Sequence, residues 1–346
     1  MTDILIVDPH TPDPELIAQA AEVLRRGGLV AFPTETVYGL GAHAFDRGAI
    51  HRVFDAKGRP ATDPLIVHVT SVERIAPLVA DIPETARTLA LRFWPGPLTL
   101  VLPRSPSVPD EVTAGLETVA VRVPAHPVAR ALLAAAAIPI AAPSANLFSR
   151  PSPTRAAHVL QDLDGRIDLL IDGGPTNVGV ESTVLDLSRS IPTILRPGAV
   201  TLEMLLEVLP RVIRGNVAAP TPTAPMPSPG LLAKHYSPRA PLTLYEGDAK
   251  SVAARLAADA RAQVARGYSV GIVAADEDPF EGAQVVRVGS EQDLAGVASR
   301  LYTALRELDA ARVDVILVRG FPALSGIGVA IADRLRRAAD GRIVRC

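Results

Sequence analysis

A chain of 346 residues is longer than one ordinary hydrophobic core, so two domains are expected, and a hydrophobic content of 48% is enough to bury both. The formal net charge of −2 gives no global attraction to a polyanion. No apolar run reaches the roughly 18 residues that cross a bilayer, so we expect a soluble protein without a membrane partner. The single cysteine, Cys346, excludes an internal disulfide and a cysteine-built zinc site, which suits a cytoplasmic location.

The first quarter of the chain alternates between predicted helices and strands. Residues 14–26 carry apolar side chains at helical spacing and end in two arginines and two glycines, which predicts an amphipathic helix. A short apolar strand over 29–32 follows. Pro33 then opens a predicted loop, in which Gly39 and Gly41 permit tight turns. This loop displays Thr34, Glu35, Thr36 and Tyr38.

Two cations follow the next predicted helix, over 47–56. Lys57 and Arg59 lie on either side of Gly58, and Pro60 stops any further helix. Arginine can bind a phosphate or carboxylate through two parallel hydrogen bonds, and lysine supplies a mobile point charge. The turn therefore suits an anionic ligand, although an exposed, solvated pair is the alternative. His68 lies on the next predicted strand, over 65–69.

Further polar residues stand at the ends of later predicted strands. Arg122 shares one face of strand 118–123 with small residues, where it is either an exposed charge or a carboxylate ligand. Ser144 and Asn146 can offer donors on the same side of a turn. Ser152 or Thr154 can cap a helix that begins there. Ser182 lacks the Gly-x-Ser-x-Gly spacing of a nucleophile, so it is interpreted as a hydrogen-bond donor.

The last third of the chain predicts a linker and a second domain. Residues 216–241 contain seven prolines, which cannot build a core, yet they include the cluster Lys234-His-Tyr236. Strands over 242–245, 269–274, 285–288 and 313–318 then alternate with helices over 251–266, 294–308 and 328–338. This pattern predicts a small α/β domain with a parallel sheet, in which we expect no second set of convergent polar residues.

Five motifs in this order resemble those of the YrdC-like family, and the C-terminal extension resembles the two-domain form of that family. The motifs are Pro33-Thr-Glu-Thr-Val-Tyr-Gly-Leu-Gly41, Lys57-Gly-Arg-Pro60, Pro143-Ser-Ala-Asn146, Glu181-Ser-Thr183 and Leu195-Arg-Pro-Gly198. The resemblance implies a twisted α/β catalytic domain over 1–215, a proline-rich linker over the active site at 216–241, and a smaller Rossmann-like α/β domain over 242–346.

The resemblance also implies a reaction, in which L-threonine, bicarbonate or CO2, and ATP give L-threonylcarbamoyl-adenylate and pyrophosphate. The product would serve modification of the adenosine next to the anticodon of tRNA, with transfer to a tRNA threonylcarbamoyl transferase complex; direct tRNA binding stays open. Lys57 and Arg59 would be catalytic, and Mg2+ would accompany ATP. The residues implied for ATP are Lys57, Arg59, Asp63, Thr118, Ser144, Asn146, Ser152, Arg196, His235 and Tyr236. Those implied for threonine are Thr36, His68, Arg122, the backbone carbonyl of Ala142, and Ser182.

One position departs from the family pattern, and two other functions stay open. Asp63 stands where we expect asparagine, and its carboxylate should repel phosphates unless Mg2+ or Lys57 compensates it. An RNA-binding module without ATP chemistry is one alternative, although aromatic residues make up only 4% of the chain. The other is a carbamoyl-adenylate enzyme of metallocentre maturation, which shares the YrdC-like core. The absence of zinc-type cysteine pairs and of an acylphosphatase-like segment argues against it.

Overall fold

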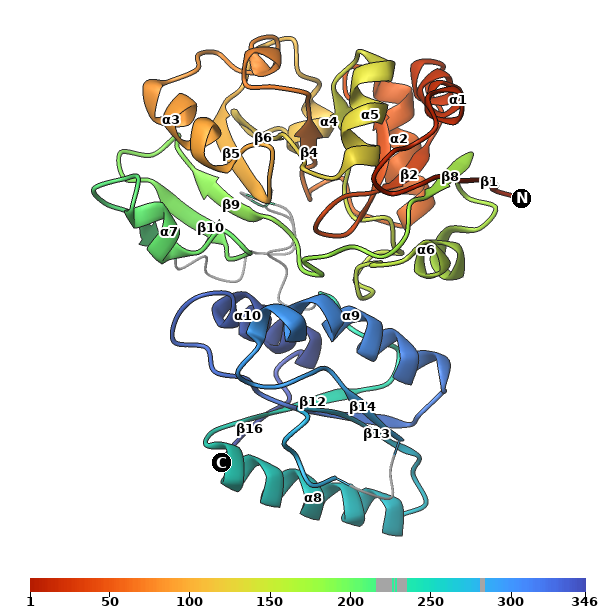
Figure 1. Ribbon diagram of the computed structural model, residues 1–346, viewed down its shortest axis with the longest axis vertical. Coiled ribbons are helices and arrows are strands. Elements are labelled where there is room, and N and C mark those ends of the chain that lie inside the picture. The colour runs from red at the N-terminus through yellow and green to blue at the C-terminus, as the bar shows by residue number, and fades with distance from the viewer. Residues whose placement is uncertain (216–225, 227, 229–234, 281–283) are drawn as a thin grey trace. The chain divides into compact units, whose positions relative to one another are not determined.

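The computed structural model describes residues 1–215, 226, 228, 235–280 and 284–346 (Figure 1). The chain divides into two compact units, Met1–Phe148 with Ser152–Leu231, and Ser149–Pro151 with Leu232–Cys346. Residues 216–225, 227 and 229–234 of the predicted linker lie outside the described residues, so the predicted linker limits stay a prediction. Within the described part of the chain, no helix has both the length and the apolar character needed to cross a membrane.

The first unit is built on one mixed sheet. Its strands are β1 (Asp3–Ile6), β2 (Val30–Pro33), β3 (Tyr38–His43), β4 (Ile66–His68), β5 (Leu98–Pro103), β6 (Thr118–Arg122), β7 (Ile140–Ala141), β8 (Leu169–Asp172), β9 (Thr183–Asp186), β10 (Thr193–Arg196) and β11 (Ile213–Arg214). Its helices are α1 (Pro14–Arg25), α2 (Arg47–Lys57), the 3-10 turn η1 (Glu73–Ile75), α3 (Glu84–Phe93), α4 (Asp110–Thr113), α5 (Pro127–Ala136), α6 (Ala156–Leu163) and α7 (Leu202–Leu206). The strand order is β1-β8-β2-β3-β7-β4-β6-β5-β9-β10-β11.

The two faces of this sheet are covered unequally. Leu40, Val67 and Val121 point to one face, where they join the main core. On the other face, α1 and α5 pack over β2 and β8, with residues such as Phe32 and Leu132 in contact. Farther along that second face, over β4, β6, β5, β9 and β10, lies a smaller apolar cluster. We call this part of the sheet the site face; its apolar residues are Ile66, Val101, Ala120, Val184 and Leu195.

The alternation predicted for residues 118–123 is confirmed. Val119, Val121 and Val123 point into the main core, and Ala120 belongs to the site face. Because side chains alternate along a strand, Arg122 shares the face of Ala120. Ile66 pairs with Ala120, and His68 pairs with Arg122. Residues paired across adjacent strands share a face, so His68 also belongs to the site face.

The loop predicted after Pro33 is wrong from Tyr38 onward. Residues 38–43 form β3, antiparallel to β2, with Phe32 opposite Gly39 and Val30 opposite Gly41. Both glycines lie within this strand and neither has a positive φ, so neither makes the predicted turn. A Cβ on Gly41 would lie 2.9 Å from both Ile140 Cγ2 and Phe32 Cε1. The glycine at this position is needed for close packing between neighbouring strands.

The second unit confirms the predicted parallel sheet. Its elements are β12 (Leu242–Glu246), α8 (Ala249–Ala265), β13 (Val270–Ala274), β14 (Gln284–Arg287), α9 (Leu294–Ala310), β15 (Val315–Arg319), α10 (Gly328–Ala339) and β16 (Ile343–Arg345). The strands lie parallel in the order β14-β13-β15-β12-β16. Figure 1 shows α8 on one side of this sheet and α9 with α10 on the other. Only three residues long, β16 was not predicted.

Substitution Gly41→Ala should lower the free energy of unfolding by about 1–3 kcal/mol, because the added methyl group must displace Ile140 or Phe32. Urea denaturation measures this change. Gly39→Ala is the matched control on the same strand, since its Cβ would meet Ala142 Cβ at an ordinary 3.4 Å. An equal loss in both variants would show that the close approach at Gly41 is not the cause.

Candidate active site

The predicted cationic turn is present at the end of α2. Gly58 adopts the left-handed conformation that ends the helix, with φ of 60°. Lys57 is buried, and its ammonium donates to the backbone carbonyls of Ser144 and Asn146. Its own carbonyl accepts the N–H of Phe148 at 2.9 Å. A buried ammonium needs such partners, so Lys57 joins the end of α2 to the turn at 143–146.

The second cation of the turn lies against a carboxylate. Arg59 Nη2 is 3.0 Å from Asp63 Oδ2 and donates to the carbonyl of Pro64 at 2.7 Å. Both charged side chains are buried. We expected Lys57 or Mg2+ to compensate Asp63, but the structure shows Arg59 as its ion-pair partner. Strands β4 and β6 are parallel, with Ile66 opposite Ala120. Thr118, two residues before Ala120, therefore lies at the end of the sheet where Pro64 leads into β4.

The turn at 143–146 is held against β3. Ser144 forms an isolated bridge with Gly39, Leu40 N donates to Pro143 O at 2.7 Å, and Ala145 N donates to Tyr38 O at 2.8 Å. Ala142, just before the turn, donates its N–H to Ile66 O. The predicted residues Ala142, Ser144 and Asn146 therefore lie between β3, β4 and Lys57.

A second group of predicted residues gathers around Arg122. Its guanidinium donates from Nε to Gly96 O at 3.2 Å and from Nη1 to Thr36 Oγ1 at 3.1 Å. Its Nη2 lies 2.7 Å from Glu35 Oε1. His68, paired with Arg122 across β4 and β6, is close to it. The structure thus brings Thr36, His68 and Arg122 together.

Ser182 and Arg196 form a third group. Ser182 hydrogen-bonds to Thr99 Oγ1 at 2.8 Å, and Arg196 Nη2 donates to the carbonyl and the hydroxyl of Ser182 at 3.0 and 3.2 Å. The loop before Ser182 is joined to the second group, because Gly179 N donates to Thr36 O at 3.1 Å. The second and third groups are therefore neighbours.

The helix cap predicted at Ser152 or Thr154 is wrong. Helix α6 begins at Ala156 with Arg155 at its N-cap, and no side chain caps it. Ser152 instead donates to Glu181 Oε1 at 2.5 Å, next to Ser182 in the chain. No role was predicted for Glu181, for Thr99 or for Glu35. The two carboxylates lie inside recognised motifs, which could have singled them out, whereas Thr99 lies in an apolar strand and gives no local signal.

His68 is a neutral imidazole at ordinary pH. Burial, together with the positive charge of Arg122, lowers the pKa of His68 from 6.5 to about 3. Its ring lies edge-on to Phe32, with centroids 6.4 Å apart. Within the described part of the chain, Nδ1 of His68 makes no hydrogen bond. The neutral ring can therefore hydrogen-bond a hydroxyl group of a ligand.

His235 and Tyr236 belong to the second unit. Tyr236 is buried at φ of 60°, with its ring centroid 5.6 Å from that of Tyr302. The guanidinium of Arg334 lies 5.2 Å from the centre of the Tyr236 ring, and the ring of His235 packs edge-on against it. Their implied role in holding ATP stays a prediction.

The second unit also contradicts one expectation, because it holds convergent polar residues. Arg319, at the end of β15, lies 2.9 Å from Asp278 and 2.6 Å from Glu291. This cluster lines a cavity of about 560 Å3 beside α8. The three residues follow three different strands and are distant in sequence, so no local pattern predicts their meeting.

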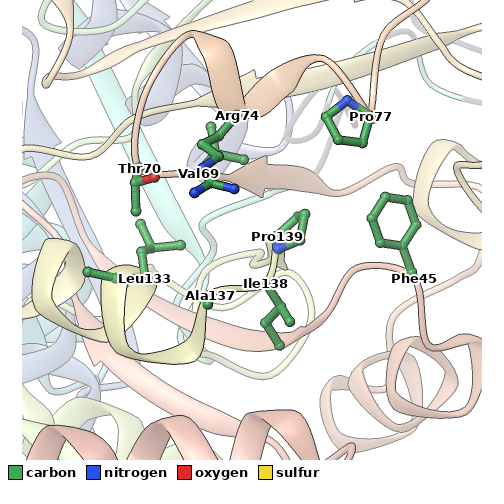
Figure 2. Close-up of a pocket in the computed structure, with 10 residues that line it drawn as sticks. Phe45, Val69, Thr70, Arg74, Pro77, Leu133, Ala137, Ile138 and Pro139 are labelled. Atoms are coloured by element: carbon green, nitrogen blue, oxygen red, sulfur yellow. The ribbon is translucent and has the colours of Figure 1, made fainter.

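Another pocket, of about 420 Å3, lies in the first unit (Figure 2). Figure 2 shows Arg74 beside Val69 and Thr70, with Phe45 and Ile138 among the other lining residues. None of the residues predicted to bind ATP or threonine lines this pocket. It is therefore distinct from the groups described above.

Comparison with known proteins places this chain in a family. A family model described as telomere recombination, for Sua5, YciO and YrdC proteins, matches residues 22–198, and one described as threonylcarbamoyl-AMP synthase, C-terminal domain, matches residues 200–340. The fold and the site together define a two-domain YrdC-like enzyme. The chain belongs to the threonylcarbamoyl-AMP synthase family.

Two relatives of the chain cover nearly all of it. The threonylcarbamoyl-AMP synthase of Bacillus subtilis is 46% identical over 97% of this chain and 96% of its own. That of Pyrococcus abyssi is 44% identical over 94% of each chain. A crystal structure of Pyrococcus abyssi Sua5 complexed with L-threonine matches with a TM-score of 0.95 and 43% identity, over 100% of both chains. These matches confirm the predicted family and the α/β fold class.

The low pKa of His68 predicts a pH dependence of stability. Between about pH 6.5 and pH 3, the unfolded chain binds a proton at His68 that the folded chain does not, so stability falls as the pH falls. From pH 7 to pH 5 this loss amounts to about 2 kcal/mol. The variant His68→Gln should lose correspondingly less stability over this interval, as measured by urea denaturation at both pH values. His51→Gln, at an exposed position, is the control. An unchanged loss in His68→Gln would contradict the assignment.

Proposed function

We propose that this enzyme makes L-threonylcarbamoyl-adenylate and pyrophosphate from L-threonine, bicarbonate or CO2, and ATP. The observation that carries the proposal is the gathering of buried Arg122, Thr36 and His68 beside Ser182 and Arg196, in the unit that also bears the Lys57–Arg59 turn. The relative whose crystal structure contains L-threonine supports threonine as the amino acid.

In this proposal the Arg122 group binds threonine. The Arg122 guanidinium takes the α-carboxylate, since its planar fork matches a carboxylate. Thr36 and neutral His68 offer hydrogen bonds to the threonine, and Ser182 offers a further hydroxyl. The carbonyl of Ala142 accepts from the amino group. A site with these buried polar groups favours an amino acid that carries a hydroxyl over one that does not, because unpaired groups would be costly.

The Lys57–Arg59 turn binds the phosphates of ATP. Ser144, Asn146, Ser152, Thr118 and Arg196 supply donors around it. Mg2+ commonly binds through substrate phosphates and one or two carboxylates. Asp63 is the carboxylate that fits such an ion. In the described part of the chain, no three His, Cys, Asp or Glu side chains gather as a metal site by themselves.

In this reaction the protein acts mainly by positioning the substrates and by supplying positive charge, rather than by covalent catalysis. The threonine amine captures CO2 as a carbamate and loses a proton. A carbamate oxygen then attacks the α-phosphorus, and pyrophosphate leaves. Cations held in place beforehand stabilise the charge that develops on the phosphates. The product would be consumed in the cytoplasm by a transferase that modifies tRNA next to the anticodon.

Release of pyrophosphate from ATP that depends on both threonine and bicarbonate tests the proposed reaction. The variant Arg59→Ala should lower kcat/KM for ATP by roughly 10- to 100-fold, because a charge-assisted contact to phosphate is lost. Arg47→Ala, which removes an exposed cation from the start of α2, should leave the rate unchanged. A normal rate in Arg59→Ala would refute the assignment of the turn. Pyrophosphate release without threonine would refute the reaction.

Asp63→Asn should raise KM for ATP several-fold. The substitution removes the carboxylate 3.0 Å from Arg59, so the guanidinium loses its buried partner and its position toward a phosphate. Steady-state kinetics at saturating threonine and Mg2+ measures the change. A lowered KM for ATP would indicate instead that the carboxylate of Asp63 repels the phosphates.

A further inference from the structure

Glu35 lies beside the group proposed to bind threonine, and nothing above gives it a role. It is 8% exposed, and its partner Arg122 is 4% exposed. Oε1 of Glu35 is 2.7 Å from Nη2 of Arg122. Oε2 accepts the backbone N–H of Ala125 at 3.0 Å, just beyond β6. The carboxylate therefore bridges the arginine and the segment that follows its strand.

Glu35 and Arg122 form an ion pair in which the two facing atoms are in contact but make no hydrogen bond. Among the described residues, neither Glu35 Oε1 nor Arg122 Nη2 makes a hydrogen bond, although the two atoms are in contact. The other nitrogens of Arg122 are engaged, Nε with Gly96 O and Nη1 with Thr36 Oγ1. Among the described residues, the N–H groups of the buried Nη2 therefore have no acceptor of their own.

This arrangement meets two opposing requirements of a buried site that binds a carboxylate. A guanidinium buried alone is costly, yet a partner that takes all its donors would block the ligand. Glu35 supplies the opposite charge at contact distance while Nη2 keeps its donors. Gly96 and Thr36 fix the plane of the guanidinium from two other segments. The backbone carbonyl of Glu35 also accepts Val178 N at 2.8 Å, on the loop that leads to Ser182.

We propose that Glu35 is a positioning residue that holds Arg122 with the Nη2 donors free for the α-carboxylate of the amino acid. Glu35 thereby sets the preference of the site for a substrate that carries a carboxylate. This inference rests on the proposed function, since it assumes that Arg122 receives the carboxylate of threonine.

The test compares L-threonine with L-threoninol, in which an alcohol replaces the carboxylate. Calorimetry on the full chain measures the ratio of the two dissociation constants. In Glu35→Gln, which keeps the size but loses the charge, the preference for threonine should fall roughly tenfold or more. The affinity for threoninol and the KM for ATP should stay unchanged. Glu35→Asp keeps the charge on a shorter side chain and should lose only part of the preference.

A matched control separates positioning from stability. Asp278→Asn breaks a different buried ion pair, that with Arg319 at 2.9 Å, and should leave the threonine preference intact. A wild-type preference in Glu35→Gln would overturn the inference. If Glu35→Gln does not fold, an undiminished preference in Glu35→Asp would overturn it equally.

Arg122→Lys distinguishes this inference from the function on which it rests. If Arg122→Lys keeps the full preference for threonine over threoninol, the assignment of Arg122 fails, and the inference about Glu35 fails with it. If Arg122→Lys loses the preference while the Glu35 variants keep it, only the role of Glu35 is overturned. Loss of the preference in both confirms the positioning role.

Discussion

The buried ammonium of Lys57 joins two stretches that are almost ninety residues apart in the chain. By donating to the carbonyls of Ser144 and Asn146, it fixes the turn at 143–146 against the end of α2. The same turn pairs with β3 through Gly39 and Ser144. The hydrogen-bonded ammonium of Lys57 therefore fixes the positions of three elements relative to one another, because an unpaired ammonium at this depth would be strongly unfavourable. The cationic turn and the residues around it depend on this contact.

Internal partners also explain how so many charges stay buried in one unit. Arg59 is compensated by Asp63, and Arg122 by Glu35. His68 avoids the problem by staying neutral. Each of these side chains is fixed before any ligand arrives, so binding requires little reorganisation of the protein. Such preorganised polar groups are the main means by which an enzyme stabilises developing charge.

Local patterns in the sequence predicted much of the fold. The helical period marked α1, alternation marked β6, and Gly58 with Pro60 marked the cationic turn, because each signal arises from a few neighbouring residues. The strand β3 was missed because its glycines, which normally favour turns, are there for close packing against Phe32 and Ile140. The helix cap at Ser152 was wrong because a distant carboxylate, Glu181, takes its hydroxyl.

The site residues show the same contrast between local signals, which the sequence contains, and contacts between distant residues, which it does not. The family resemblance implied roles for Arg122 and Thr36, and the structure brings them into contact. The pairing of Glu35 with Arg122, and the meeting of Asp278, Glu291 and Arg319, join residues from separate loops and strands. Only the folded sheet brings such residues together, so composition and periodicity contain no trace of these pairs.

A crystal structure of the chain with L-threonine and a non-hydrolysable ATP analogue tests the central claim most directly, namely that the first unit seats both substrates side by side. The account predicts the threonine carboxylate within about 2.7–3.2 Å of Arg122, and the phosphates within the same distance of Arg59. A nucleotide bound away from the Lys57–Arg59 turn, or a threonine carboxylate that does not contact Arg122, would contradict it.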